Sequence, residues 1–233
     1  MLPAAGRGSR MASVTAGSAK EALPLAGRTV LDLVLDEAFA AGAKRAVVVS
    51  AREKGDIEPI VVSRNEIVDL RYQDEQRGLA HAIVSAGEFD EDALILLPDT
   101  VFQPAGASSP LACAGPGADG AILSQPVSDS DVPRYGILEC DGTRIRRILE
   151  KPAATETASR LAIAARFLLS PRLLEVLREY VKAPQDTDEY DLTTGLNLAL
   201  ARGMKLVAAP TNARRFDCGS PAGYQLAVEA FGK

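Results

Sequence analysis

Hydrophobic and polar positions follow two different periods along the chain, and together they predict strands and helices in turn. Several short segments are continuous apolar runs, as in strands that are buried on both faces of a parallel sheet. The predicted strands are residues 44–51, 67–73, 93–100, 120–127 and 205–211. Between them, apolar residues at helical spacing predict helices over 30–43, 78–89 and 171–181. This alternation is typical of an α/β fold.

One stretch departs from the alternation. Between residues 135 and 151 the period changes to two around Asp141-Gly142, a dipeptide suited to a tight turn, which predicts an antiparallel hairpin. We expect this hairpin to form a small lobe over about residues 128–170. No repeat or long linker divides the rest, so we expect a single domain over residues 1–233.

The ends of individual elements also carry signals. Ser170-Pro171 and Ser220-Pro221 each place a capping side chain before a proline suited to the first helical position. At the start, only three residues precede a glycine-rich loop that in such folds follows a complete strand. Either the first strand is unusually short, or it begins upstream of this numbering.

Composition excludes several classes of partner. The chain has 233 residues, 47% of them hydrophobic, and a formal charge of -5, so no basic face for nucleic acid is indicated. Three cysteines (Cys113, Cys140, Cys218) and a single histidine lack metal-ligand spacing, which favours reduced thiols and a cytoplasmic protein. No apolar run approaches the ~20 residues of a membrane span, and we expect no membrane partner. A homo-oligomer remains open.

The opening segment contains the first candidate chemistry. Residues 4–25 read AAGRGSRMASVTAGSAKEALPL, a glycine loop followed by Arg10 and Lys20. Gly6 and Gly8 would let backbone N–H groups approach phosphate oxygens, and the two cations could neutralise them. The dinucleotide-binding fingerprint would need a third glycine where Met11 stands, which disfavours an oxidoreductase. Without further signals, a surface turn with solvated cations is an alternative.

The same segment resembles the signature of sugar-1-phosphate nucleotidyltransferases, Gly-X-Gly-Ser/Thr-Arg-Met followed by a lysine and Leu-Pro. It is most similar to the branch of bacterial UDP-glucose pyrophosphorylases, in which Lys-Glu precedes Leu-Pro-Leu, as Lys20 to Leu25 do here. Ser13 and Ala19 stand where that branch usually has proline. The resemblance implies a Rossmann-like, mostly parallel mixed sheet with helices on both faces, and a magnesium-dependent enzyme.

Residues of nucleotide recognition follow from this resemblance. Gln73, five residues before Gly78, matches the family's glutamine that reads the pyrimidine edge, and the glycine leaves room for the base. Ala5, Gly6 and Gly8 match its nucleotide-binding loop. On its own, Gln73 would be a polar strand end, and we expect His81 to be structural.

Two aspartates match the family's magnesium ligands. Asp99 follows the apolar run 93–97 and thus stands at the carboxyl end of a predicted strand, where ligands bind in open α/β sheets. Asp217 matches the family's second ligand in Asp-Cys-Gly. A helix-capping role is the alternative for Asp217, but Ser220 is better placed as the cap.

The hairpin lobe resembles the family's sugar-binding part. Gly136 and Glu150 match its sugar-binding pair, and Lys151 matches the lysine that holds the sugar phosphate. Ala165 stands where the family usually has a glycine against the sugar.

The implied substrates are a nucleoside triphosphate, with UTP favoured, and a sugar 1-phosphate, with glucose 1-phosphate favoured. Phosphoryl-type transfer needs positioning and charge neutralisation, which Arg10, Lys20 and Lys151 would supply. A dTTP-dependent enzyme, or one for another hexose phosphate, remains open. So does a nucleotide-sugar-binding homologue without turnover.

Overall fold

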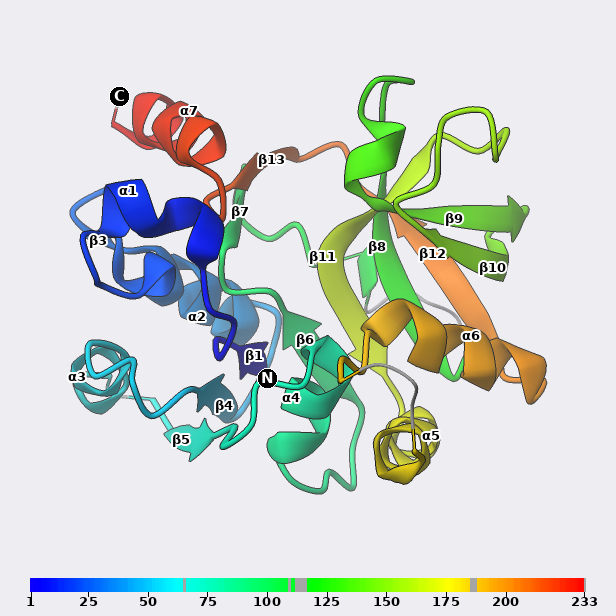
Figure 1. Cartoon of the computed structure of the whole chain (residues 1–233), viewed down its shortest axis with the longest axis horizontal. Helices are drawn as coiled ribbons and strands as arrows, with labels where there is room; N and C mark the ends of the chain where they lie inside the picture. Colours follow the sequence, from blue (N-terminus) through cyan, green and yellow to red (C-terminus); the bar gives the residue numbers. More distant parts are fainter. Residues whose placement is uncertain (65, 109, 112–116, 185–187, 233) are drawn as a thin grey trace.

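A long mixed β-sheet with helices on both faces forms the centre of the molecule (Figure 1). The computed structural model describes residues 1–64, 66–108, 110–111, 117–184 and 188–232. Three parallel strands form one part of the sheet, in the order β1 (Leu2–Pro3), β4 (Ala46–Ser50) and β5 (Val68–Tyr72). The other part has the order β6 (Ala93–Leu96), β11 (Leu161–Leu169), β8 (Gly120–Pro126), β12 (Leu206–Pro210), β10 (Arg144–Glu150) and β9 (Gly136–Asp141).

Two hydrogen bonds join these parts between β1 and β6. The amino group of Met1 donates to the carbonyl of Leu94 at 2.6 Å, and the Leu96 N–H donates to the Met1 carbonyl at 3.0 Å. The short first strand therefore links the two parts of the sheet.

The expected mixed sheet is confirmed, and antiparallel pairing has a larger share in it than the apolar runs suggested. Strand β11 runs antiparallel to both β6 and β8, while β8 and β12 are parallel. An internal strand covered on both faces is apolar whichever way it runs, so its composition does not reveal its direction.

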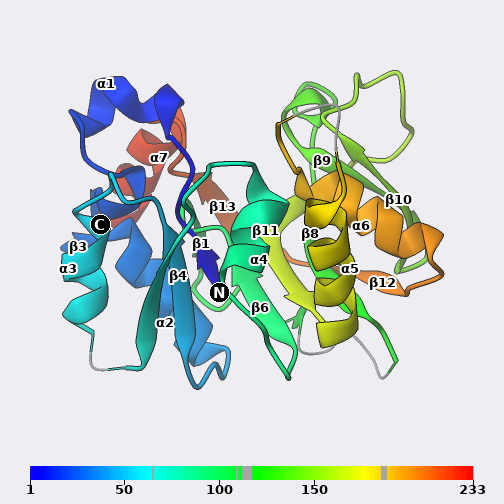
Figure 2. The ribbon, with the colours of Figure 1, turned by 60° about the horizontal axis from the view of Figure 1, so that its bottom comes forward.

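Helices cover both faces of the sheet, as Figure 2 shows from a second side. The side chains of β4 alternate between two apolar clusters, Val47 and Val49 in one and Val48 in the other. The cluster around Val48 includes residues of α2 (Val30–Ala40), α3 (Ile57–Val62) and α7 (Pro221–Phe231). The opposite cluster includes residues of α4 (Leu79–Ser85), α5 (Pro171–Lys182) and α6 (Leu192–Ala201). None of the helices among the described residues is long and apolar enough to cross a membrane.

Most predicted element ends agree with the structure within about two residues, but the helices predicted over 30–43 and 78–89 end earlier, at Ala40 and Ser85. Ser170 and Ser220 cap α5 and α7, their hydroxyls accepting hydrogen bonds from backbone N–H groups at 3.3 Å. The predicted hairpin is β9 and β10, with Gly142 in the turn at φ 58°. The strand predicted over 93–100 is too long. It ends at Leu96, because Pro98 has no N–H for a ladder, and a separate strand β7 (Thr100–Gln103) follows.

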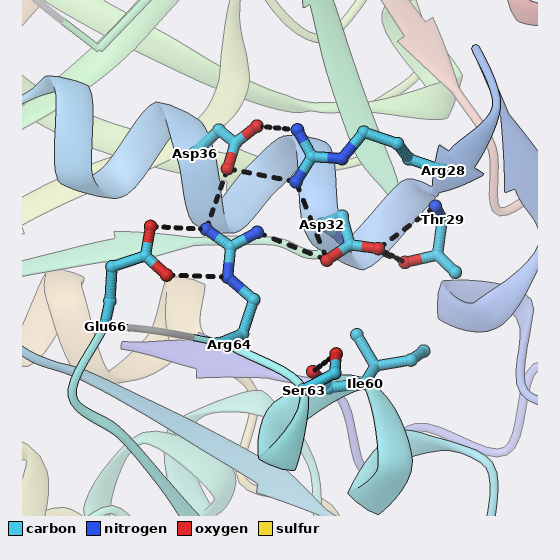
Figure 3. Close-up of polar contacts among 8 residues, drawn as sticks. All are labelled: Arg28, Thr29, Asp32, Asp36, Ile60, Ser63, Arg64 and Glu66. Carbon is cyan, nitrogen blue, oxygen red and sulfur yellow. Dashed lines mark hydrogen bonds and ion pairs between the residues drawn. The ribbon is translucent and has the colours of Figure 1, made fainter.

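Helix α2 is held at its start by a cluster of charged side chains (Figure 3). Thr29 caps the helix and accepts from the Asp32 N–H at 3.1 Å. Arg64, which follows α3, donates to Asp32 at 3.2 Å and to Asp36 at 2.8 Å. Arg28 adds a second guanidinium to Asp36. These contacts connect α2 with the end of α3.

Candidate active site

Strand pairing brings two distant carboxylates together. Asp99 lies just before β7, and Asp217 is the last residue of β13 (Arg214–Asp217), which pairs antiparallel with β7. In this register Asp217 is opposite Thr100, and the Cys218 N–H donates to the Asp99 carbonyl at 2.8 Å. A Cβ placed on Gly219 would lie 2.7 Å from Asp99 Oδ2 and 2.9 Å from Asp217 Oδ1. The two carboxylates thus converge on one point, which only a glycine leaves open.

A buried lysine neutralises one of these carboxylates. Lys20 Nζ donates to Asp99 Oδ2, and its aliphatic stem packs against Gly8. Burial alone would raise the pKa of Asp99, but the positive charge of Lys20 holds it below its usual value. For Lys20 the effects reverse: burial opposes its charge, yet Asp99 and Glu21 raise its pKa. Both groups are therefore charged at neutral pH.

The segment that carries Lys20 is held by a second lysine and by an aspartate. Lys54 Nζ donates to the Ala4 carbonyl at 2.6 Å and to Glu21 Oε2 at 3.0 Å. Asp56 Oδ2 accepts from the Ala19 N–H at 2.7 Å. Glu21 is only 1% exposed, and this burial raises its pKa despite the neighbouring lysines. These contacts connect the start of the glycine loop with the residue next to Lys20.

The glycine loop lies between β1 and this segment. Ala5 is buried, and Gly8 has the positive φ of 64° that favours glycine. Buried Met11 anchors the loop, whereas Arg10 is exposed. Arg10 is nonetheless close enough to lower the pKa of Asp99. A Cβ on Gly6 would meet nothing within 4 Å, so packing inside the chain does not require a glycine at this position.

Gln73 and Gly78 meet at the carboxyl end of β5. The Gln73 side chain is 4% exposed, and its Nε2 donates to the Gly78 carbonyl at 3.3 Å. Gly78 has φ 90°, and a Cβ there would lie 2.6 Å from the Tyr190 carbonyl oxygen. The same amide nitrogen lies 2.8 Å from Nδ1 of His81. The histidine that we expected to be structural is thus in contact with the candidate base-reading residue.

The hairpin brings the candidate sugar-binding residues together. Gly136 is opposite Glu150 in the register of β9 and β10, and a Cβ there would lie 3.5 Å from Glu150 Oε2. Glu150 accepts from the Thr193 hydroxyl at 2.8 Å and forms an ion pair with Lys151 at 3.4 Å. Lys151 is largely exposed. Ala165 has φ 58°, a backbone region that favours glycine, in agreement with the glycine usual at this position in the resembled family.

The glycine loop and the lobe stand on the same side of the sheet. In Figure 2 the helix after the loop, α1 (Ala12–Thr15), and the segment before β9 are both at the top of the view, and in Figure 1 both are in the upper half. Arg215 connects the carboxylate region with the lobe. It lies two residues before Asp217 in β13, on the same face of the strand. Its guanidinium donates to the Ile163 carbonyl at 2.8 Å and lies 4.0 Å from the centroid of the Tyr135 ring.

Sequence reasoning missed two of these residues, Arg215 and Lys54. A period of two along residues 214–217 could have indicated that Arg215 shares a side with Asp217. No sequence signal distinguishes Lys54 from a surface lysine, because its partners are a loop carbonyl and a distant glutamate.

The cysteines are free thiols wherever the structure describes them. Cys218, expected to be a packing residue, is fully buried, and burial together with Asp99 and Asp217 raises its pKa to about 12. Cys140 is half-buried, and Cys113 lies outside the described residues.

The two converging carboxylates are suited to a divalent cation that also binds a phosphate. Nowhere in the described part of the chain do three or more acidic, histidine or cysteine side chains form a metal-binding group. Mg²⁺ is usually held by one or two carboxylates together with substrate phosphates, so two aspartates match its needs.

The fold, with a glycine loop and paired carboxylates at one edge, defines a nucleotide-transferring α/β protein. The chain belongs to the nucleotidyl transferase family, whose model matches residues 1–231. It is 29% identical over 259 residues to a UTP–glucose-1-phosphate uridylyltransferase of Mycoplasma pneumoniae, covering 96% of this chain and 88% of that protein. A putative UTP–glucose-1-phosphate uridylyltransferase of Methanocaldococcus jannaschii is 25% identical over 255 residues, covering 96% of this chain and 89% of that protein.

Solved structures share the fold. A UDP-glucose pyrophosphorylase complexed with UDP-glucose superposes with a TM-score of 0.87 at 24% identity, covering 99% of this chain and 97% of that one. An inositol-1-phosphate CTP transferase from T. maritima has a TM-score of 0.82 at 17% identity, covering 100% of this chain and 93% of that one. At these identities the likeness establishes a shared fold, and a fold by itself does not specify which nucleotide is bound.

Proposed function

We propose that the chain transfers the uridylyl group of UTP to glucose 1-phosphate, giving UDP-glucose and pyrophosphate. It would do so as one domain over residues 1–233, with 128–170 as the sugar lobe. Family membership and the names of the relatives support this. The observation that carries it is the convergence of Asp99 and Asp217 beside Lys20, between the glycine loop and the hairpin.

Asp99 and Asp217 would hold Mg²⁺. When bound, the ion supplies positive charge to the phosphates. In this structure Lys20 pairs with Asp99, and a triphosphate offers Lys20 other anionic partners. We propose that Lys20 exchanges Asp99 for phosphate when the nucleotide binds, which makes the carboxylate available to the ion.

The reaction then needs little covalent help from the protein. An oxygen of the sugar phosphate attacks the α-phosphorus in line, and the bond from that phosphorus to the leaving pyrophosphate oxygen breaks. Lys151 would orient the attacking phosphate, because its exposed side chain can reach a phosphate bound beside the lobe. Arg10 and Lys20 would stabilise the departing pyrophosphate.

The remaining groups would bind the substrates on either side of the carboxylates. The base and nucleotide would contact Ala5, Gly6, Gly8, Gln73 and Gly78, and the sugar would contact Gly136 and Glu150. The free thiols of Cys140 and Cys218 agree with a reducing compartment, and we propose the cytoplasm.

Pyrophosphate release with UTP, dTTP, CTP, ATP and GTP against several sugar 1-phosphates tests the assignment. Asp99→Asn and Asp217→Asn should each lower the rate by ~10²- to 10³-fold, the usual cost of losing one charge-stabilising group. Asp141→Asn is the matched control, because Asp141 is the last residue of β9, outside the candidate site, and among the described residues its carboxylate pairs with Arg146 at the surface. An Asp99 or Asp217 variant that keeps more than about a third of the wild-type rate in excess magnesium would contradict the metal assignment.

A further inference from the structure

The Gln73 side chain can adopt only one orientation of its amide. One terminal atom lies 3.3 Å from the Gly78 carbonyl oxygen and 2.8 Å from His81 Nδ1. A carbonyl oxygen only accepts hydrogen bonds, so the atom that faces Gly78 must be the amide nitrogen. Its two hydrogens are then directed at Gly78 and at His81.

This arrangement fixes the protonation of His81 as well. Nδ1 must accept from Gln73, so the neutral ring carries its proton on Nε2. Burial, followed by the charge of Arg77, lowers the pKa of His81, so the ring remains neutral at neutral pH. The ring is stacked on Tyr190, with centroids 6.5 Å apart and planes at 25°, and the His81 carbonyl accepts from Ser85.

The other end of the amide is free. Gln73 Oε1 accepts no hydrogen bond from the described residues. Among those residues, Ser124 Oγ is the only fully buried side-chain nitrogen or oxygen without a partner, so Gln73 Oε1 is not fully buried. With both N–H groups engaged, Gln73 can only accept from a ligand. The structure therefore leaves this amide only the role of acceptor.

We propose that His81 is a positioning residue for base selection, which holds the Gln73 amide so that it presents only an acceptor to the base. The inference rests on the proposed function, in which Gln73 contacts the base. Uracil and thymine carry a hydrogen on N3 and can donate to Oε1. Cytosine has a lone pair on N3, which would face the Oε1 lone pairs. CTP would then bind poorly because two acceptors face each other without a hydrogen bond, and not because cytosine is too large.

Removing the Nδ1 acceptor tests this role. His81→Leu provides an apolar side chain of similar size without the Nδ1 acceptor. The Gln73 amide is then free to rotate and to offer its nitrogen to cytosine. His81→Asn restores an acceptor, because asparagine Oδ1 and histidine Nδ1 are both attached to Cγ and occupy similar positions. Ser85→Ala is the control, since it removes a contact to the His81 carbonyl without reaching Gln73.

The ratio of kcat/KM for UTP to that for CTP is the measurement. We expect His81→Leu to narrow it about tenfold, the effect of one ordinary hydrogen bond, and His81→Asn and Ser85→Ala to preserve it. If His81→Leu keeps the wild-type ratio while the wild type uses UTP, this inference is wrong and the proposed function stands. A wild type that does not use UTP refutes both.

The wild-type protein offers a second test that does not depend on the folding of a variant. The chain has a single histidine, so its imidazole nitrogen NMR signals need no assignment in tag-free protein. We expect Nδ1 to be unprotonated and Nε2 to carry the hydrogen. A proton on Nδ1 would overturn the proposal.

Discussion

Replacing Arg166 with methionine would remove the guanidinium that holds the Asp99 turn. Arg166 is fully buried and forms two hydrogen bonds with the Glu37 carboxylate, at 3.0 and 2.8 Å. It also donates to the carbonyls of Leu97 at 3.2 Å and Thr100 at 2.7 Å, on either side of Asp99. Breaking a buried pair by removing one partner costs about 3–5 kcal/mol. We therefore expect Arg166→Met to lower the free energy of unfolding by about 4 kcal/mol at pH 7.

The loss should depend on pH in a defined direction. In the wild type, burial opposes ionisation of Glu37, but Arg166 holds its pKa below the usual value. That contribution is present above the unfolded-state pKa and is lost as the pH falls through the folded-state pKa. In Arg166→Met only burial and Ser108 remain, and we expect the pKa of Glu37 to rise above its unfolded value. The resulting penalty is then relieved as the pH falls.

Urea denaturation of both proteins at pH 7 and pH 5 measures this. The difference in stability should shrink at pH 5. Arg166→Met/Glu37→Leu should lose less stability than the single variant, because no lone charge is left buried. The reasoning would be refuted if Arg166→Met lowered the free energy of unfolding by less than about 1 kcal/mol at pH 7, or by the same amount at both pH values.

Two further predictions concern other parts of the molecule. Arg64→Ala removes the guanidinium shared by three carboxylates beside α2 and should cost about 1 kcal/mol, whereas Arg45→Ala, in an exposed single pair with Asp69, should cost less; salt should reduce the first loss. Equal losses in urea titrations would argue against a cooperating cluster. Cys218, with a pKa of about 12, should not react with a disulfide reagent at pH 8 until the protein unfolds, as peptide mapping can establish. Rapid modification of the folded protein would contradict its burial.

The sequence predicted the elements that depend on local periodicity. The predicted helices, the hairpin and both serine caps follow from spacing of a few residues, and the structure contains them. Strand β11 was not among the predicted strands, although its nine residues lie between β6 and β8 in the six-stranded part. An apolar run of this kind does not show which neighbours it will pair with.

The same limit applies to the site. Asp99 could be placed from its position after an apolar run, but its proximity to Asp217 depends on the pairing of β7 with β13, which no local pattern contains. The contact between Gln73 and His81 likewise arises from the turn around Gly78. The family resemblance identified both carboxylates, because a family's sequence pattern marks positions that meet only in the folded protein. It gave no role to His81.

The pairing of β7 with β13 also decides when the site can exist during synthesis. Chains fold largely from the N-terminal side as they leave the ribosome. The glycine loop, Lys20 and Asp99 are translated well before Asp217 and Gly219. Until Asp217 is translated, a nascent chain can contain the pair of Lys20 with Asp99 but not the pair of carboxylates. Translation of β13 is therefore a precondition for the two carboxylates to meet.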